Sequence, residues 1–188
     1  MGGNDTQQGV AIVIGGESPY RRVVTTRSAA GRSHIFIDGR ARNFGTLHEH
    51  WMTDGGAPPL HAAVADPVWR PFKIEPQSGG TVFRFVEIEP EAKFAHLSDE
   101  ERRKAVRFTF SRVASENALV NTARHPAMHQ TETVDYIIVL SGCVTMLLDE
   151  GEVELRPFDV VVQRGTNHAW VNKSSEPALL AAVLTAAR

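Results

Sequence analysis

The chain has one cysteine, no excess of positive charge and no long hydrophobic run. The single Cys143 excludes an intramolecular disulfide. The N-terminal sequence MGGNDTQQG has neither a basic region nor an apolar stretch of the kind that directs export, so we expect a cytoplasmic protein. The longest apolar candidate, residues 178–187, is shorter than the roughly 20 residues that span a bilayer, so no membrane partner is expected.

The charged residues are nearly balanced, with 20 Lys and Arg against 22 Asp and Glu and a formal net charge of −2. This balance gives no basic footprint for nucleic acid, and we expect no nucleic-acid partner. The 188 residues, of which 42% are hydrophobic, suffice for one well-packed domain, whereas a second independent core would be small.

Short alternating apolar segments separated by turn residues dominate the C-terminal half. Segments of this length and spacing predict a β-sandwich or a β-barrel. Further strands are expected in the N-terminal half, where Asp38-Gly39 is a strong turn signal. The expected strands are residues 10–14, 22–26, 34–37, 46–53, 81–88, 133–140, 143–149, 152–155, 159–163, 168–172 and 178–184.

One helix is expected among these strands. Ser98-Asp99-Glu100-Glu101 is a capping box, in which the serine hydroxyl and Glu101 satisfy free backbone N–H groups. We expect a helix over residues 99–107, and its continuation to residue 115 stays open because Phe108-Thr109-Phe110 also suits a strand. The segment is either a solvated helix or a lid over the barrel mouth, since it directly precedes the polar strand described below.

A proline-rich segment covers residues 55–80. Proline has no backbone N–H, so this segment does not suit a central strand or helix. We expect a long loop that packs over the barrel through Val68, Trp69 and Phe72, with a linker between two domains as the alternative. Its five prolines are Pro58, Pro59, Pro67, Pro71 and Pro76.

Two strands in the C-terminal half change from apolar to polar along one face. Side chains alternate across a strand, so four polar residues that begin at His129 share a face with Ile137 and Val139. In the second strand, His168, Trp170 and Asn172 follow a glycine-containing turn at a period of two. Such strands suit a barrel with an apolar core and a polar open mouth. The four polar residues are His129, Thr131, Thr133 and Asp135.

These two segments resemble the two halves of the cupin signature. Thr131 stands where the family has its second histidine, and Gln163 replaces the usual turn proline. The resemblance implies a mostly β, double-stranded β-helix (jelly-roll) barrel with an N-terminal extension and one short helix. It implies a single domain, with residues 1–80 packed on a barrel of residues 81–188. The matching residues are His129, Asp135, Gly142, Gly165, His168 and Asn172.

Three of these residues form a candidate site. Two imidazoles and a carboxylate, here His129, Asp135 and His168, suit a divalent metal such as Zn, Fe, Mn or Ni, with His125 as a possible additional ligand. The metal would act as a Lewis acid. A metal-free alternative uses His129 or His168 as general base and Asp135 to orient the imidazole. A third interpretation is that these polar residues are buried for structural reasons only.

Other polar and aromatic residues have weaker assignments. We expect Thr131 and Thr133 to offer hydroxyl groups to a substrate, and Trp170 either to stack on the substrate or to belong to the core. His48 and His50 alternate along the strand at residues 46–53, but no third ligand follows at a suitable spacing. We therefore interpret both as ordinary strand residues.

The sequence predicts a cupin-fold enzyme that acts on a small organic molecule. Both the metal and the metal-free site suit proton abstraction next to a carbonyl, as in isomerisation, dehydration or decarboxylation. A cupin dioxygenase is a variant of this hypothesis, and a non-catalytic cupin that binds a small organic acid or sugar is the alternative. A homodimer through an exposed N-terminal strand edge is also expected, because free edges invite pairing.

Overall fold

A computed structural model describes residues 15–56, 60 and 65–187, and the strand expected at residues 10–14 lies outside this range. The described residues form ten strands, one α-helix and three short 3₁₀ helices. The strands are β1 (Glu17–Arg27), β2 (Ser33–Phe44), β3 (Leu47–Thr53), β4 (Thr81–Ile88), β5 (Thr133–Ser141), β6 (Val144–Leu148), β7 (Glu152–Leu155), β8 (Val160–Arg164), β9 (His168–Val171) and β10 (Ala178–Ala186). The helices are α1 (Asp99–Arg112), η1 (Pro67–Trp69), η2 (Glu91–Phe94) and η3 (Glu116–Ala118).

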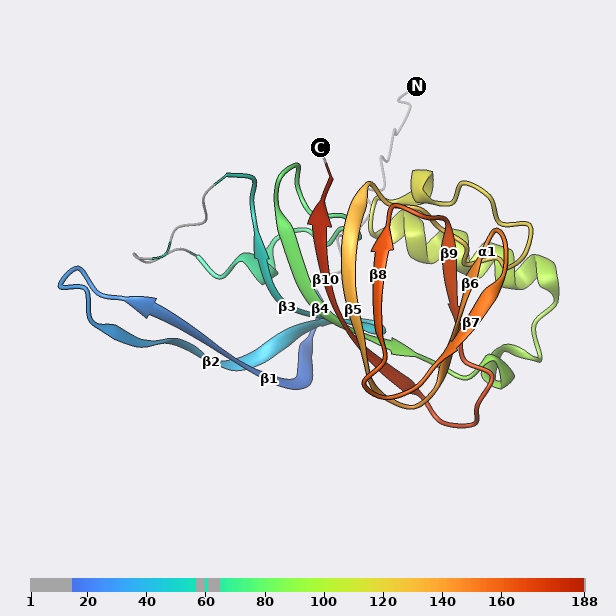
Figure 1. Cartoon of the computed structure of the whole chain (residues 1–188), viewed down its shortest axis with the longest axis horizontal. Coiled ribbons are helices and arrows are strands. Elements are labelled where there is room, and N and C mark those ends of the chain that lie inside the picture. The colour runs from blue at the N-terminus through green and yellow to red at the C-terminus, as the bar shows by residue number, and fades with distance from the viewer. Residues whose placement is uncertain (1–14, 57–59, 61–64, 188) are drawn as a thin grey trace, which may run out of the picture.

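The strands form two antiparallel sheets that face each other (Figure 1). Seven strands follow the order β1-β2-β3-β4-β10-β5-β8, and the smaller sheet has the order β7-β6-β9. The expected mostly β jelly-roll barrel with one short helix is confirmed. The larger sheet is continuous across the expected division at residue 80, because β3 pairs with β4.

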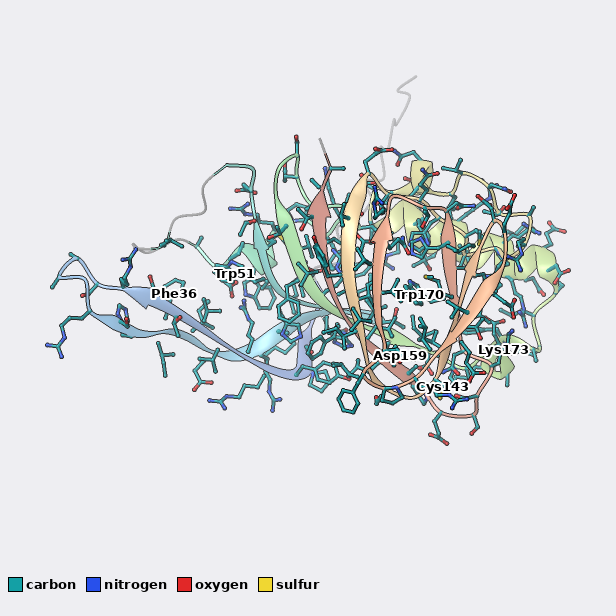
Figure 2. The ribbon with its side chains drawn as sticks, in the orientation of Figure 1. Phe36, Trp51, Cys143, Asp159, Trp170 and Lys173 are labelled. Carbon is teal, nitrogen blue, oxygen red and sulfur yellow. The ribbon has the colours of Figure 1, made fainter. Side chains whose placement is uncertain are left out.

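The core lies between the two sheets (Figure 2). The alternation of β5 produces it, because Ile137 and Val139 point inward while Tyr136 and Ile138 stay on the outer face. Gly142 ends this strand with a φ of 73°, and a Cβ there would lie 2.7 Å from the Cα of Ala178. Only glycine fits this turn without a shift of the backbone.

The helix begins with the predicted capping box and continues to Arg112, beyond the expected end at residue 107. The Ser98 hydroxyl accepts from the Glu101 backbone N–H at 3.3 Å, and the Glu101 carboxylate accepts from the Ser98 N–H at 2.8 Å. Phe108-Thr109-Phe110 therefore lies in the helix rather than in a strand. No helix among the described residues has the length and apolar character that crossing a membrane requires.

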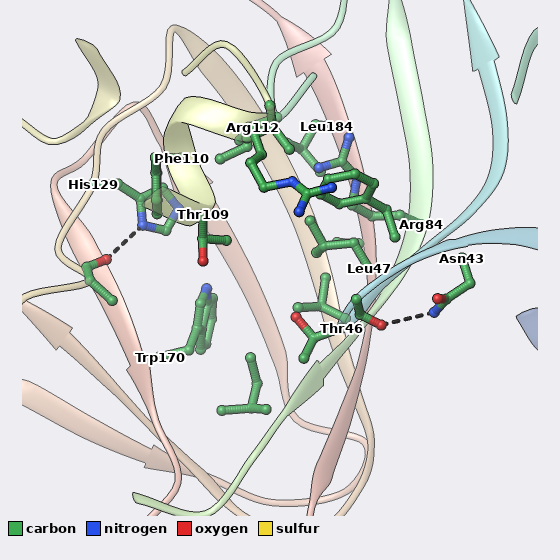
Figure 3. A pocket seen from close by; sticks show the side chains of 18 of the residues that line it. Asn43, Thr46, Leu47, Arg84, Thr109, Phe110, Arg112, His129, Trp170 and Leu184 are labelled. Carbon is green, nitrogen blue, oxygen red and sulfur yellow. Dashed lines mark hydrogen bonds between the residues drawn. The ribbon is translucent and has the colours of Figure 1, made fainter. Parts of the chain in front are cut away.

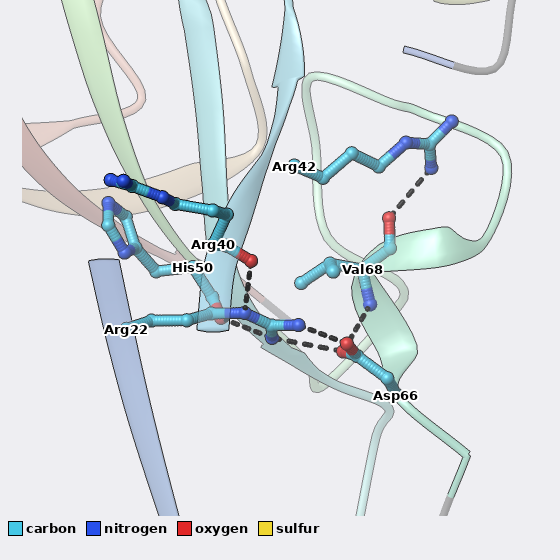
Figure 4. A network of polar contacts seen from close by, with 6 residues as sticks. All are labelled: Arg22, Arg40, Arg42, His50, Asp66 and Val68. Atoms are coloured by element: carbon cyan, nitrogen blue, oxygen red, sulfur yellow. Dashed lines mark hydrogen bonds and ion pairs between the residues drawn. The ribbon is translucent and has the colours of Figure 1, made fainter. Parts of the chain in front are cut away.

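Arginines on the N-terminal strands hold the described part of the proline-rich segment (Figure 4). Arg22 pairs with Asp66 and also donates to the backbone carbonyl of His50 at 3.0 Å. Arg42 donates to the carbonyl of Val68 at 2.7 Å. Val68 is fully buried, whereas Trp69 stays 47% exposed, so the expected packing holds for the first and not for the second.

A row of charged residues crosses three neighbouring strands beneath that segment. Arg42 on β2 lies opposite Glu49 on β3, and Glu49 lies close to Arg84 on β4. The Arg84 Nε is 2.9 Å from a carboxylate oxygen of Glu49, and none of the three residues is more than 3% exposed. This Arg42-Glu49-Arg84 row is a buried charge cluster in which one carboxylate faces two guanidinium groups.

His50 is buried on the neighbouring part of β3, where its ring lies 4.1 Å from that of Phe85 and 5.1 Å from that of Phe83. Burial lowers the pKa of His50 to about 4, and His48 and Arg22 add to the effect. Because the unfolded chain binds a proton near pH 6.5 and the folded chain does not, the contribution of His50 to stability is present above that pH. It is lost as the pH falls toward the folded pKa.

We therefore expect His50→Phe to become more stable, relative to the wild type, as the pH is lowered. Between pH 8 and pH 5 this relative gain is about 2 kcal/mol, because the phenyl ring has no proton to bind on unfolding. Urea unfolding of both proteins at the two pH values measures it. His34→Gln, at an exposed position, is the matched control, and an equal gain in that variant would contradict the assignment. The prediction concerns the difference between variant and wild type, because Glu49 also titrates in this range. Burial raises its pKa to about 7, which changes stability with pH in the opposite sense, and this effect is common to both proteins.

Candidate functional site

A cavity of about 710 Å³ opens between the larger sheet and α1 (Figure 3). Its walls come from the turn between β2 and β3, from β4, β5, β9 and β10, and from the last turns of α1. The lining is mainly apolar, and its polar side chains are few. Those that carry charge or titrate are Arg84, Arg112, His129, Asp135 and His168.

The structure brings the two predicted histidines together. His129 lies just before β5 and His168 begins β9, and each backbone N–H donates to the other residue's carbonyl, at 2.8 and 2.9 Å. Their ring centroids are 4.3 Å apart. This local pairing aligns both side chains toward the same cavity, which Asp135 also lines from β5.

Hydrogen bonds to the backbone orient both imidazoles in the same way. The Nδ1 of His129 is 3.0 Å from the carbonyl of Ala127, and the Nδ1 of His168 is 3.0 Å from the carbonyl of Thr166. We assign Nδ1 as the protonated nitrogen in each ring, because a carbonyl only accepts. The Gln163 side-chain amide lies against the His168 ring, with its nitrogen 2.6 Å from Nδ1 and 3.1 Å from Nε2. The Nε2 of His129 makes no hydrogen bond with the described residues and carries an available lone pair.

Burial shifts the titration of all three groups toward their neutral forms. It lowers the pKa of His129, and it lowers the pKa of His168 to about 3 with a further contribution from His129. Burial also raises the pKa of Asp135, against the effects of Thr133 and Arg84. One carboxyl oxygen of Asp135, Oδ1, is buried without a hydrogen-bond partner in the described part of the chain.

The predicted metal ligands do not come together as a set. Within residues 15–56, 60 and 65–187, no three His, Cys, Asp or Glu side chains are close enough to hold one ion. His125 lines a second cavity of about 320 Å³, and its Nε2 is 3.4 Å from Glu91. The described residues therefore do not fit a three-ligand metal centre, and we derive no chemical step through a metal.

The predicted substrate-binding residues are only partly placed in the cavity. Trp170 lines it, with its ring 5.7 Å from that of His168 in an edge-on arrangement, and it also lines the second cavity. Thr131 and Thr133 are buried behind the lining, where their hydroxyl groups bond to each other at 2.7 Å. The two threonines are thus placed to support the site rather than to form its wall.

Several residues at the site had no role in the sequence interpretation. Phe110 on α1 lies 5.4 Å from the ring of His129, and Arg84 and Arg112 line the cavity from β4 and from the end of α1. The strand pattern could have predicted that Gln163 faces the site. Gln163 pairs with Asp135 across β5 and β8, so its side chain points to the same face as the acid.

Comparison with known proteins finds similarity in the C-terminal part of this chain. The family model described as "Cupin domain" matches residues 120–184, which include His129, Asp135 and His168. The Phomopsin biosynthesis cluster protein C' of Diaporthe leptostromiformis is 54% identical over 48 residues, covering 25% of this chain and 25% of that protein. The cupin-domain-containing oxidoreductase fogC of Aspergillus ruber is 44% identical over 46 residues, covering 24% and 23%. The match thus spans about a quarter of the length of these curated relatives.

Among solved structures, a Cupin 2 conserved barrel domain protein from Salinispora arenicola CNS-205 is similar, at 15% identity and a TM-score of 0.33. The similarity covers 56% of this chain and 62% of that chain. The family match on residues 120–184 coincides with the strands that hold both imidazoles and the acid. Residues 120–184 therefore match the cupin domain family, and this segment carries the candidate site.

Proposed function

We propose that this protein is an enzyme that acts on a small molecule and removes a proton from the carbon atom next to a carbonyl group. The observation that carries the proposal is the neutral His129 imidazole, oriented by its bond to Ala127, with its Nε2 directed at a cavity of substrate size. Asp135 lines the same cavity as a carboxyl group whose pKa is raised. Burial lowers the pKa of His129 and raises that of Asp135, and both shifts favour the protonation states in which His129 is the base and Asp135 the acid.

The proposed step transfers two protons. The Nε2 of His129 takes a proton from the carbon next to the carbonyl, while the Asp135 carboxyl group donates its proton to the carbonyl oxygen. The product is an enol, with an imidazolium and a carboxylate on the protein. Return of the imidazolium proton to a second carbon, and of the enol proton to Asp135, completes an isomerisation. Departure of a β-hydroxyl group as water, with the imidazolium proton, gives dehydration. Decarboxylation of a 3-oxo acid begins instead with loss of carbon dioxide: the electron pair of the broken C–C bond forms the enol while Asp135 protonates the carbonyl oxygen. His168 stays neutral, because burial and the neighbouring His129 lower its pKa to about 3, so the site gains no second positive charge.

An oxidoreductase is a second candidate, favoured by the names of two relatives. Two matching proteins, from Aspergillus ruber and Neurospora crassa, are called cupin-domain-containing oxidoreductases. In this chain, a metal for such chemistry would draw its ligands from His129, His168 and Asp135. Metal analysis of protein purified without an affinity tag separates the two candidates, because proton transfer by His129 continues after treatment with a chelator.

Hydrogen exchange in deuterium oxide tests the proposal without knowledge of the product. A panel of aryl ketones and 2-oxo acids is incubated with the protein, and loss of the proton signal next to the carbonyl is followed by NMR. We expect exchange with at least one member that is faster than in buffer and insensitive to chelator. Exchange at the buffer rate throughout the panel, or exchange that requires a stoichiometric metal, would contradict the proposal.

We further propose that two copies associate through the N-terminal arm formed by β1 and β2, which projects from the barrel (Figure 1). β1 is an edge strand of the seven-stranded sheet, and Val23 and Ile35 on the arm are 47% and 59% exposed. Light scattering at micromolar concentration is expected to give twice the chain mass. The double variant Val23→Asp, Ile35→Asp should give a folded monomer, and a monomeric wild type would reject the dimer.

A further inference from the structure

One cation at the cavity has no counter-ion among the described residues. Arg112 ends α1, and its guanidinium group lies 5.7 Å from the ring centroids of both Phe44 and Phe108. It makes neither a hydrogen bond nor an ion pair with the described part of the chain. Figure 3 shows its side chain extended across the cavity on the side where Arg84 and Leu184 lie. The two aromatic rings hold the cation in place without neutralising it.

The other charges around the cavity leave an excess of positive charge. Arg84 is matched by Glu49 at 2.9 Å, and that carboxylate also faces Arg42. Asp135 is the one carboxyl group among the described lining residues. The lining thus carries two arginines against one carboxyl group, and the Glu49 carboxylate that pairs with Arg84 also faces Arg42. The cavity therefore favours an anion.

The rest of the lining indicates what the uncharged part of that anion is. The lining of the cavity is mostly aromatic and branched aliphatic, and Thr109 adds a hydroxyl group near Trp170 (Figure 3). A ligand that fills the cavity therefore needs an apolar body, and a flat ring suits the faces of Phe110 and Trp170. The apolar lining includes Val86, Ile88, Phe110, Ile137, Trp170 and Leu184.

We infer that the cavity selects an aryl-substituted carboxylic acid, with the carboxylate bound by Arg112 and the apolar body between Phe110 and Trp170. This inference rests on the proposed function, because it names the substrate class of the same site. The carboxylate at Arg112 anchors one end of the ligand, while the reacting carbon lies toward His129. A guanidinium group suits this role because it presents several donors to a carboxylate.

Calorimetric titration with matched acids and amides tests the inference. The probes are phenylacetate, 3-phenylpropionate and 4-phenylbutyrate, each compared with its neutral amide at pH 8. We expect at least one acid to bind the wild type about tenfold or more tightly than its amide, as a charge-assisted contact of this kind predicts. Arg112→Gln should remove this preference, and Arg112→Lys should retain part of it.

Arg107→Gln is the matched control, because Arg107 is an exposed arginine of the same helix that does not line the cavity. It should keep the wild-type ratio of acid to amide affinity. Equal binding of acid and amide, no binding of any acid, or an unchanged ratio in Arg112→Gln would overturn the inference. Binding needs no proton transfer, so an Arg112-dependent ratio without hydrogen exchange would remove the proposed reaction and leave the ligand class standing.

Discussion

His129→Gln should lower the rate of enzyme-dependent hydrogen exchange by about 100-fold to 10,000-fold, the range that a positioned general base contributes. Glutamine keeps a similar size and a hydrogen-bonding end but has no basic nitrogen. The variant should still bind the aryl acids, because Arg112 and the apolar lining are untouched. The rate is measured by NMR in deuterium oxide, with the ketones and 2-oxo acids used for the wild type.

His96→Gln, which changes an exposed histidine away from the cavity, is the control for this result. Its exchange rate should equal that of the wild type. Loss of exchange in both variants would point to damage unrelated to the site. If His129→Gln exchanges at the wild-type rate, His129 is not the base, because glutamine has no basic nitrogen that could take its place.

Glu49→Gln should lower the free energy of unfolding by about 3–5 kcal/mol, the cost found when one partner of a buried ion pair is removed. The substitution leaves Arg42 and Arg84 buried and facing each other without a carboxylate between them. The measurement is urea unfolding at pH 8, above the value of about 7 to which burial raises the pKa of Glu49. At this pH the wild-type carboxylate is ionised. The desolvation that raises its pKa then costs the folded state part of its stability, so this cost offsets part of the loss and we expect the lower end of the range.

A surface ion pair provides the comparison. Glu154 lies 2.9 Å from Arg156, and both side chains are largely exposed. Glu154→Gln should therefore change the free energy of unfolding by less than about 1 kcal/mol. Similar losses in the two variants would mean that the Arg42-Glu49-Arg84 row is accessible to water and does not act as a buried charge cluster.

The barrel was predictable because its strands follow a two-residue period and are separated by glycine-containing turns. The strand at residues 152–155 and the strand at residues 81–88 have the expected bounds, and the capping box at Ser98 starts α1 as expected. The end of α1 was not predictable, because Phe108-Thr109-Phe110 alternates like a strand. Phe110 is buried with its ring 5.4 Å from that of His129, a long-range contact that local sequence does not encode.

The candidate site was predictable in part for the same reason. His129 and His168 come together because they flank paired segments of the barrel, and the family resemblance indicates that pairing. Arg84 and Arg112 carry no comparable signal, since an arginine on a strand or at a helix end is most often exposed. Their position depends on how β4 and α1 close around the cavity, and this is a property of the tertiary structure.

The cupin match begins at residue 120, downstream of several residues that form the cavity wall. Residues 120–184 contain the imidazoles and the acid, whereas Phe44, Arg84 and Arg112 lie upstream of them. On the proposed assignment, the reacting groups and Trp170 therefore lie inside the matched segment, whereas Phe110 and the carboxylate-binding Arg112 lie outside it. A chimera that receives residues 120–184 from a relative would keep Arg112 and Phe110 of the recipient and, if the proposal holds, its preference for an acid.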